Sequence, residues 1–539
     1  MIPNHHHRVE HLSWGDTVFL HLEREGMPLN VASVCLLEGE VSLDACLRFI
    51  ESKLPLIPRY LKCVVAPPLN IGLPSWEYDR KFDIHNHVRE VTLKHGTDSE
   101  LKALAGKLFS TVLDRRHPLW DVTVVHGLKE NRTGFIFRVH HCLADGIAGV
   151  GLMSKLLDAS PEAPALPKKK IHFRNPPRRD AINSLMDGVV NSYADFVKQL
   201  LSAWADLLTM AERVAANSGR SVASDEFSRL LPEITAFTER MRFNVLYRGP
   251  QKFAWADVPL AEVKAIKQVC GASVNDVILA LVTATIRRYL EHHGDRVDGR
   301  LLRMMVPVSL RGTESPGELG NRISLVPVTI PLDIRNPRKL LAAAHTRTEF
   351  LKRSHAAELV SLAGGLIGMF PTAMRALAGP ILSQLPVTPF NLVCTNVPGP
   401  QFPLYLLGHK MVRWYPYVPV GGEMAVNCAI LSYDGNVYFG FSGDVHAAPD
   451  LHRLEEFLKL SFEELREAAK LRPPRTRKKN VRAKPRATSK PAPGPAAVHA
   501  SIPPLQSLLL QTLVADPAPA SPVILKIPAN SAENVRRFP

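Results

Sequence analysis

Two adjacent histidines, His140 and His141, are the residues whose types and spacing most readily suggest chemistry. They belong to the stretch RVHHCLADGI (residues 138–147), in which Asp145 and Gly146 follow four and five residues after the second histidine. Such a group could bind a metal ion, act as an acid–base device, or consist of two core histidines beside an ordinary loop. Imidazole is a natural candidate for proton transfer because its ordinary pKa lies near neutral pH.

The residues before the motif have the alternating pattern of a β-strand. In TGFIFRVHH (residues 133–141), alternation places Val139 and His141 on one face and Arg138 and His140 on the other. Neighbours on a strand point in opposite directions, and zinc ligands are usually spaced differently. We therefore expect the two histidines to be inequivalent, and we expect no metal site here.

The place of His141 in the chain leaves two interpretations open. A histidine on an apolar face is usually structural. Here, however, the strand is followed at once by an apolar stretch typical of a helix, IAGVGLMSKLLD (residues 147–158). The turn between such a strand and helix is where α/β folds place functional groups. A general base at this point would accelerate a reaction by about 10²–10⁴-fold.

Composition divides the chain into four regions, and the histidine motif lies near the end of the first. At 539 residues, with 46% hydrophobic and 22% charged residues, the chain is expected to be globular with at least two domains. Residues 1–158 and 181–471 each mix strand and helix patterns. Residues 159–180 are rich in proline and basic residues and predict a linker or crossover. Residues 472–539 lack periodicity and predict a disordered, basic, Pro/Ala-rich tail.

Apolar periodicity predicts the individual elements of the two mixed regions. Strands are expected at residues 30–39, 119–128, 133–141, 301–310, 322–332, 390–397 and 425–444, and helices at 43–54, 100–113 and 450–470. Within the last strand pattern, Asp434-Gly435 has the turn chemistry of a hairpin.

Charge and cysteines indicate the compartment. Of the net charge of +15, +10 lies in residues 472–539, which we expect to be solvated or attracted to anionic lipid. No aromatic residues interleave the basic run, so nucleic acid is not an expected partner. Seven scattered cysteines favour reduced thiols over disulfides or structural zinc. The first residues lack a signal-peptide pattern, and no apolar run has the length of a membrane span, so the cytoplasm is expected.

Several blocks of sequence resemble one known family. HHCLADG fits the HHxxxDG signature of CoA-dependent acyltransferases, which chloramphenicol acetyltransferase and peptide-synthetase condensation domains share. Further blocks resemble the bacterial wax ester synthase/diacylglycerol acyltransferase family, in order and at similar spacing over residues 10–470. They are LSWGDTVFLHLE (12–23), HPLWD (117–121), SVNDVILALV (273–282), VPVSLR (306–311), LGNRIS (319–324) and TNVPGP (395–400).

The resemblance implies an α/β fold of two chloramphenicol-acetyltransferase-like domains, joined by a crossover, with a tunnel at their interface. His141 would be the general base that takes the proton from a diacylglycerol or fatty-alcohol hydroxyl as this oxygen attacks an acyl-CoA thioester. Acyl-CoA would be a co-substrate, and no bound cofactor is expected. His140 would support the base, Asp145 would pair with an arginine to fix the loop, and Gly146 would form the turn.

The resemblance also suggests roles for residues outside the motif. The oxyanion of the tetrahedral intermediate needs hydrogen-bond donors, and the candidates are Asn275, Thr395 and Asn396. Asn275-Asp276 could equally begin a helix as a cap, and the TNVPGP block could be only a rigid turn. Residues expected to be structural near the tunnel are Pro118, Leu119, Trp120 and Asp276.

The apolar nature of the implied substrates suggests attachment to the inner membrane or to lipid inclusions. The proline-interrupted apolar residues 358–385 could lie in a lipid interface, line the tunnel, or form a core helix. Two other functions stay open: an acyltransferase of the same fold with a different hydroxyl or amine acceptor, and a catalytically silent lipid-binding homologue. Acceptor preference, acyl chain length and oligomeric state depend on more than the sequence.

Overall fold

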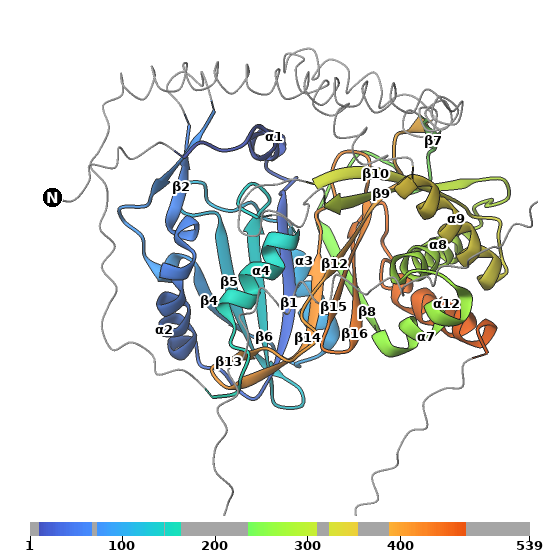
Figure 1. The fold of residues 1–539 in the computed structure, drawn as a ribbon. Coiled ribbons are helices and arrows are strands. Elements are labelled where there is room, and N and C mark those ends of the chain that lie inside the picture. The colour runs from blue at the N-terminus through green and yellow to red at the C-terminus, as the bar shows by residue number, and fades with distance from the viewer. Residues whose placement is uncertain are drawn as a thin grey trace, which may run out of the picture. The chain divides into compact units, whose positions relative to one another are not determined.

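The computed structural model describes residues 10–66, 73–144, 146–162, 236–309, 323–353 and 387–470 (Figure 1). Two six-stranded mixed sheets form the framework of this part of the chain. Two short pairs add to them: β2 (Lys62–Val65) with β3 (Ser75–Tyr78), and β7 (Thr238–Glu239) with β11 (Val387–Thr388).

The first sheet places the histidine motif at the end of a central strand. Its order is β13-β14-β1-β6-β5-β4, and β4 and β5 are its one parallel pair. The strands are β1 (Asn30–Glu38), β4 (Val88–Thr92), β5 (Trp120–Leu128), β6 (Arg132–His140), β13 (Tyr405–Leu406) and β14 (His409–Tyr417). Both faces of β6 are buried after its first residue, so every polar side chain on it needs a partner inside the protein.

The second sheet has the order β10-β9-β12-β15-β16-β8, in which β12 runs parallel to β9 and β15. Its strands are β8 (Gln251–Pro259), β9 (Leu301–Ser309), β10 (Ile323–Pro331), β12 (Leu392–Pro398), β15 (Val426–Tyr433) and β16 (Asn436–Asp444). Asp434 and Gly435 join β15 to β16 with φ values of 40° and 81°, so the predicted hairpin is confirmed.

Helices pack against these sheets. They are α1 (Trp14–Leu22), α2 (Leu43–Lys53), α3 (Asp98–Phe109), α4 (Gly146–Leu156), α7 (Leu260–Cys270), α8 (Val274–His292), α9 (Pro337–Arg353) and α12 (Arg453–Ala468). Short 3₁₀ turns occupy Leu54–Leu56, Pro58–Leu61 and Ile84–Asn86. Within the described residues no single helix is long and apolar enough to cross a membrane. The pair α7 and α8 together has that length and apolar composition, but the two helices are bent by 102° relative to each other.

The two sheets interlock through β14. This strand comes late in the chain, yet it pairs with β1 in the first sheet (Figure 1). It also contacts the second sheet, where Arg413 Nη1 donates to Asp257 Oδ2 at 2.6 Å. The approach is so close that a Cβ on Gly440 would lie 1.8 Å from the Pro416 carbonyl oxygen. The N- and C-terminal regions thus share a sheet, and the domain limits at residues 158, 180 and 471 remain predictions.

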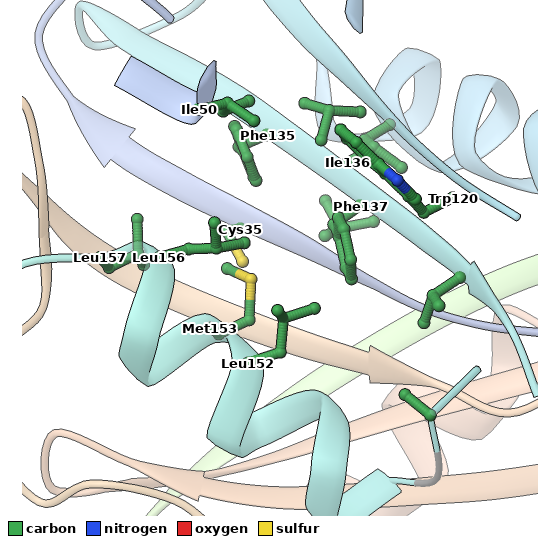
Figure 2. Close-up of a cluster of buried hydrophobic side chains, with 14 of the residues drawn as sticks. Cys35, Ile50, Trp120, Phe135, Ile136, Phe137, Leu152, Met153, Leu156 and Leu157 are labelled. Atoms are coloured by element: carbon green, nitrogen blue, oxygen red, sulfur yellow. The ribbon is translucent and has the colours of Figure 1, made fainter. Parts of the chain in front are cut away.

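Each sheet has its own hydrophobic core. Figure 2 shows part of the first, where Leu152, Met153 and Leu156 of α4 point toward Cys35 of β1 and Phe137 of β6. The second surrounds α8, which is buried along most of its length. Packing of α4 onto the first sheet fixes the segment that follows the histidine motif.

Candidate active site

His141 lies in the turn between β6 and α4. Its backbone N–H donates to the Leu29 carbonyl oxygen at 2.9 Å, which ties the turn to the residue before β1. Its ring stacks on Phe19 of α1, with ring centres 3.9 Å apart and planes 14° from parallel. Nδ1 is buried and makes no hydrogen bond with the residues that the structure describes.

This environment favours the neutral form of His141. Burial lowers the pKa of the imidazole to about 4; the ring's own backbone carbonyl opposes this effect and nearby His140 adds to it. At pH 7 the ring is therefore uncharged and keeps a lone pair that can accept a proton. The neutral ring is the form in which a histidine can act as a general base.

His140 has a different environment. Its side chain is fully buried, and its Nδ1 accepts the backbone N–H of Cys142 at 3.1 Å. Since Nδ1 is an acceptor, the ring proton belongs on Nε2, which lies 3.3 Å from Glu23 Oε2. His140 is thus held between the turn and a buried carboxylate, whereas His141 lies against Phe19.

Glu23 links the end of α1 to both histidines. Besides His140, Oε2 accepts the Leu29 N–H at 3.1 Å, and Oε1 lies 3.2 Å from Arg115 Nη2. Burial would raise the pKa of the Glu23 carboxyl, but the contacts with His140, Leu29 and Arg115 outweigh it and lower the pKa. Glu23 is therefore ionised, and it fixes Leu29, whose carbonyl holds the His141 backbone.

A second buried carboxylate supports the strand that leads to the motif. Arg138 on β6 donates through Nε to Asp121 Oδ1 on β5 at 2.8 Å, and through Nη1 to Thr111 Oγ1 at 2.8 Å. Arg89 also pairs with Asp121. Removing one partner from such a buried pair would leave an uncompensated charge, so the pair constrains the register of β5 and β6.

Pro118, Leu119 and Trp120 are buried at the start of β5. The Leu119 carbonyl accepts the His140 N–H at 2.9 Å. Trp120 Nε1 donates to the Tyr60 carbonyl at 2.7 Å. These contacts support the structural role expected for Leu119 and Trp120. Their place beside a tunnel remains a prediction.

The oxyanion candidates come from α8 and β12. Asn396 Nδ2 donates to Asn275 Oδ1 at 3.2 Å, so the structure brings these two together although they are far apart in sequence. Thr395 precedes Asn396 on β12, and α4, which follows the histidine motif, contacts this strand. Their role as donors remains a prediction.

Asp276 is a structural residue at the start of α8. It is fully buried and forms a capping box, in which Oδ2 accepts the Ser273 N–H at 2.7 Å. His345 and Thr348 of α9 also donate to it. Burial alone would raise the pKa of Asp276, but these hydrogen bonds outweigh it and lower the pKa. Asp276 thus joins α8 to α9.

Some predicted features lie outside the described residues. Asp145 is one of them, so its pairing with an arginine remains a prediction, while Gly146 begins α4. The apolar residues 358–385, the tail and most of the linker are also outside.

Models of known protein families match most of the chain, and they are models of the family that the sequence blocks resemble. A model of the wax ester synthase/diacylglycerol acyltransferase catalytic domain matches residues 12–278, and a model of the C-terminal domain of the same family matches residues 319–466. The chain belongs to the wax ester synthase/diacylglycerol acyltransferase family. The family predicted from the sequence blocks is therefore confirmed.

Relatives of the chain carry acyltransferase names. A chain of Mycobacterium tuberculosis H37Rv named probable diacylglycerol O-acyltransferase tgs1 is 28% identical over 458 residues, covering 83% of this chain and 93% of the relative. Another, named probable diacylglycerol O-acyltransferase tgs2, is 29% identical over 463 residues, covering 84% and 98%. Both matches span nearly the whole of the relative.

Solved structures share the fold. The wax ester synthase/diacylglycerol acyltransferase of Marinobacter aquaeolei VT8 matches with a TM-score of 0.61 and 22% identity, over 86% of this chain and 100% of that one. The first condensation domain of the calcium-dependent antibiotic synthetase matches with 0.53 and 13%, over 86% and 97%. The predicted α/β acyltransferase fold is confirmed.

Phe19, Glu23 and Arg115 are site residues that were not predicted from the sequence. The first two lie in the block LSWGDTVFLHLE, which was matched to the family only as a pattern. Phe19 lies in α1, whereas Glu23 follows the last residue of this helix with extended backbone, so a helical spacing rule does not connect the two. Glu23 and Arg115 reach their partners only through the tertiary fold.

Proposed function

We propose that this chain transfers a fatty acyl group from acyl-CoA to the hydroxyl of diacylglycerol, of a long-chain alcohol, or of both. The products would be triacylglycerol or wax ester and free CoA. Family membership and the names of the relatives support the reaction class. The observation that supports the chemistry most directly is the neutral His141 ring against Phe19 at the end of β6.

The proposed mechanism needs one base and no covalent enzyme intermediate. A hydroxyl is a weak nucleophile, whereas a thioester is already reactive, so assistance is needed at the hydroxyl. His141 accepts the hydroxyl proton as the oxygen attacks the thioester carbon. The tetrahedral oxyanion then collapses, the carbon–sulfur bond breaks, and the imidazolium returns its proton to the CoA sulfur. Acyl-CoA is consumed as the second substrate.

Asn275 and Asn396 are the proposed oxyanion stabilisers, with Thr395 beside them. Their mutual hydrogen bond gives the pair a defined orientation on α8 and β12. A preorganised donor stabilises developing charge because it needs no reorientation during the reaction, and losing one such donor typically costs about 10²–10³-fold in rate.

The reaction is tested with the purified full chain and palmitoyl-CoA. Hexadecanol, a diacylglycerol and a primary amine are supplied in separate arms, and the products are quantified by mass spectrometry together with released CoA. Wax ester or triacylglycerol in a 1:1 ratio with CoA is the expected result. Turnover only with a primary amine acceptor would favour a condensation-type reaction. Tight acyl-CoA binding without any product would favour a silent lipid-binding homologue.

The chain is further proposed to act at the surface of a membrane or lipid inclusion. The acceptors are apolar, and residues 472–539 carry a net charge of +10, which anionic headgroups would attract. Binding of the full chain and of a chain ending at residue 471 to anionic vesicles would be compared at low and high salt. Equal binding of the two would remove the tail from this proposal.

A further inference from the structure

Three potential metal ligands from separate parts of the chain meet at the end of α8. His292 is the last residue of this helix, His293 follows it, and Asp450 lies in the turn before α12. One ligand atom from each lies within 4.8 Å of the other two. More than 150 residues separate Asp450 from the histidines, so no local sequence pattern indicates this cluster.

The tautomer of His293 leaves a lone pair facing this cluster. Its Nδ1 lies 3.0 Å from the backbone carbonyl oxygen of Tyr289. A carbonyl can only accept, so Nδ1 carries the proton. In the neutral ring Nε2 is then an acceptor, yet it lies 3.4 Å from Asp450 Oδ1, which is also an acceptor. Two facing acceptors require a proton or a metal cation between them.

Hydrogen bonding also orients the Asp450 carboxylate toward the two histidines. Its Oδ1 accepts the Tyr289 hydroxyl at 2.8 Å, while Oδ2 lies 3.9 Å from His292 Nε2. A carboxylate oxygen can only accept, so the Tyr289 hydroxyl is the donor in this contact. Tyr289 thus holds both Asp450, through its hydroxyl, and His293, through its backbone carbonyl.

This arrangement has the supporting contacts of a metal site. Metal-binding histidines usually donate their other N–H to a carbonyl or carboxylate, and metal-binding carboxylates are themselves hydrogen-bonded. Bonds of about 2.0–2.1 Å in a tetrahedron place zinc ligands about 3.3–3.5 Å apart. His293 Nε2 lies 3.4 Å from Asp450 Oδ1 and His292 Nε2 lies 3.9 Å from Asp450 Oδ2, and one ligand atom from each of the three residues lies within 4.8 Å of the others. Side-chain rotations that bring the three atoms closer together would complete the site.

We propose that His292, His293 and Asp450 bind a divalent cation of the zinc class, with water in the fourth position. The mixed imidazole and carboxylate donors suit Zn²⁺ better than Mg²⁺ or Ca²⁺, which prefer oxygen ligands. The ion would connect the end of α8 to the turn before α12, two helices that pack together. The site lies apart from the acyltransfer residues, and the proposal does not rest on the proposed function.

The competing explanation is a simple ion pair between protonated histidine and Asp450. A test must also remove the three histidines near the start, His5, His6 and His7, since they could bind metal themselves. The chain is therefore studied with these three replaced by alanine and stripped of metal by a chelator. Co²⁺ is titrated and followed by its visible absorption, and Zn²⁺ is titrated by calorimetry.

One equivalent of tightly bound metal per chain is the expected result, with a rise in the unfolding temperature when Zn²⁺ is present. His293→Ala and Asp450→Asn should each weaken binding at least tenfold. Tyr289→Phe should weaken it by about tenfold, since it removes only a supporting contact. His452→Ala is the matched control, because His452 is exposed two residues after Asp450 and should leave binding unchanged.

Absence of saturable binding in the unaltered cluster would overturn the proposal and leave the ion pair. Binding by His293→Ala and by Asp450→Asn that is as tight as binding by the unaltered cluster would overturn it as well, because the metal would then lie elsewhere. Circular dichroism of each variant establishes that it is folded. Acyltransfer activity is measured separately, so failure of the enzyme assay and failure of the metal site are told apart.

Discussion

Replacing Phe19 with alanine removes the ring that lies against His141. Burial is the largest cause that lowers the pKa of His141 from 6.5 to about 4. A difference of this size corresponds to about 3 kcal/mol in favour of the neutral ring. Phe19 forms one wall of the site at a ring distance of 3.9 Å. Its loss admits water, so the pKa should rise by about one unit or more toward its ordinary value.

The consequence is visible in the pH dependence of kcat/KM. This quantity reports the protonation of the free enzyme's base, and activity is lost as the pH falls through the pKa of His141. The unaltered chain should therefore remain active down to about pH 5, and the decline should begin at higher pH in Phe19→Ala. Ester formation from palmitoyl-CoA would be measured by mass spectrometry between pH 4.5 and 8. Val18→Ala controls for loss of a neighbouring apolar side chain from the same helix, provided that it folds.

Two results would refute this reasoning. One is an acid limb of the unaltered chain near pH 6.5, which would mean that His141 is not held neutral by burial. The other is an identical acid limb in Phe19→Ala, which would mean that the stacked ring does not control the environment of His141. A lower rate in Phe19→Ala with an unchanged pH profile would also count as this second result, because the pKa of His141 would not have changed.

Two further substitutions test the buried carboxylates. Glu23→Gln should lower the free energy of unfolding by about 1.5–3 kcal/mol, because it removes charge-assisted contacts; it should also lower kcat, since the Leu29 carbonyl holds His141. Glu25→Gln, at an exposed neighbour, should change neither. Asp276→Asn should lower the free energy of unfolding by a similar amount, about 1.5–3 kcal/mol, because it weakens the contacts that join α8 to α9. Urea unfolding measures both, and free energies equal to that of the unaltered chain would contradict the assigned roles.

Local patterns were enough to predict much of the fold. The strand that carries Arg138 and His140, the helix at residues 43–54, and the Asp434-Gly435 hairpin all follow from periodicity or turn chemistry. The family followed from blocks spread over the chain. These features depend on neighbours in sequence or on recurring motifs, which a single sequence contains.

Long-range pairings could not be predicted in the same way. Nothing in the local sequence indicates that β14 joins β1, or that Glu23 lies beside His140. Arg138 alone gave a hint, because a charged side chain on a strand buried on both faces must have a partner. That partner, Asp121, was matched as part of a block without being given this role.

The central claim is that His141 is the base for acyl transfer, and one measurement tests it most directly. The rate of ester formation from palmitoyl-CoA is compared between the unaltered chain and His141→Ala, at pH 7 with saturating acceptor and with folding verified by circular dichroism. A fall in kcat of about 10²–10⁴-fold, as expected for the loss of a general base, is the predicted result. Ester formation at an undiminished rate in His141→Ala would contradict the mechanism.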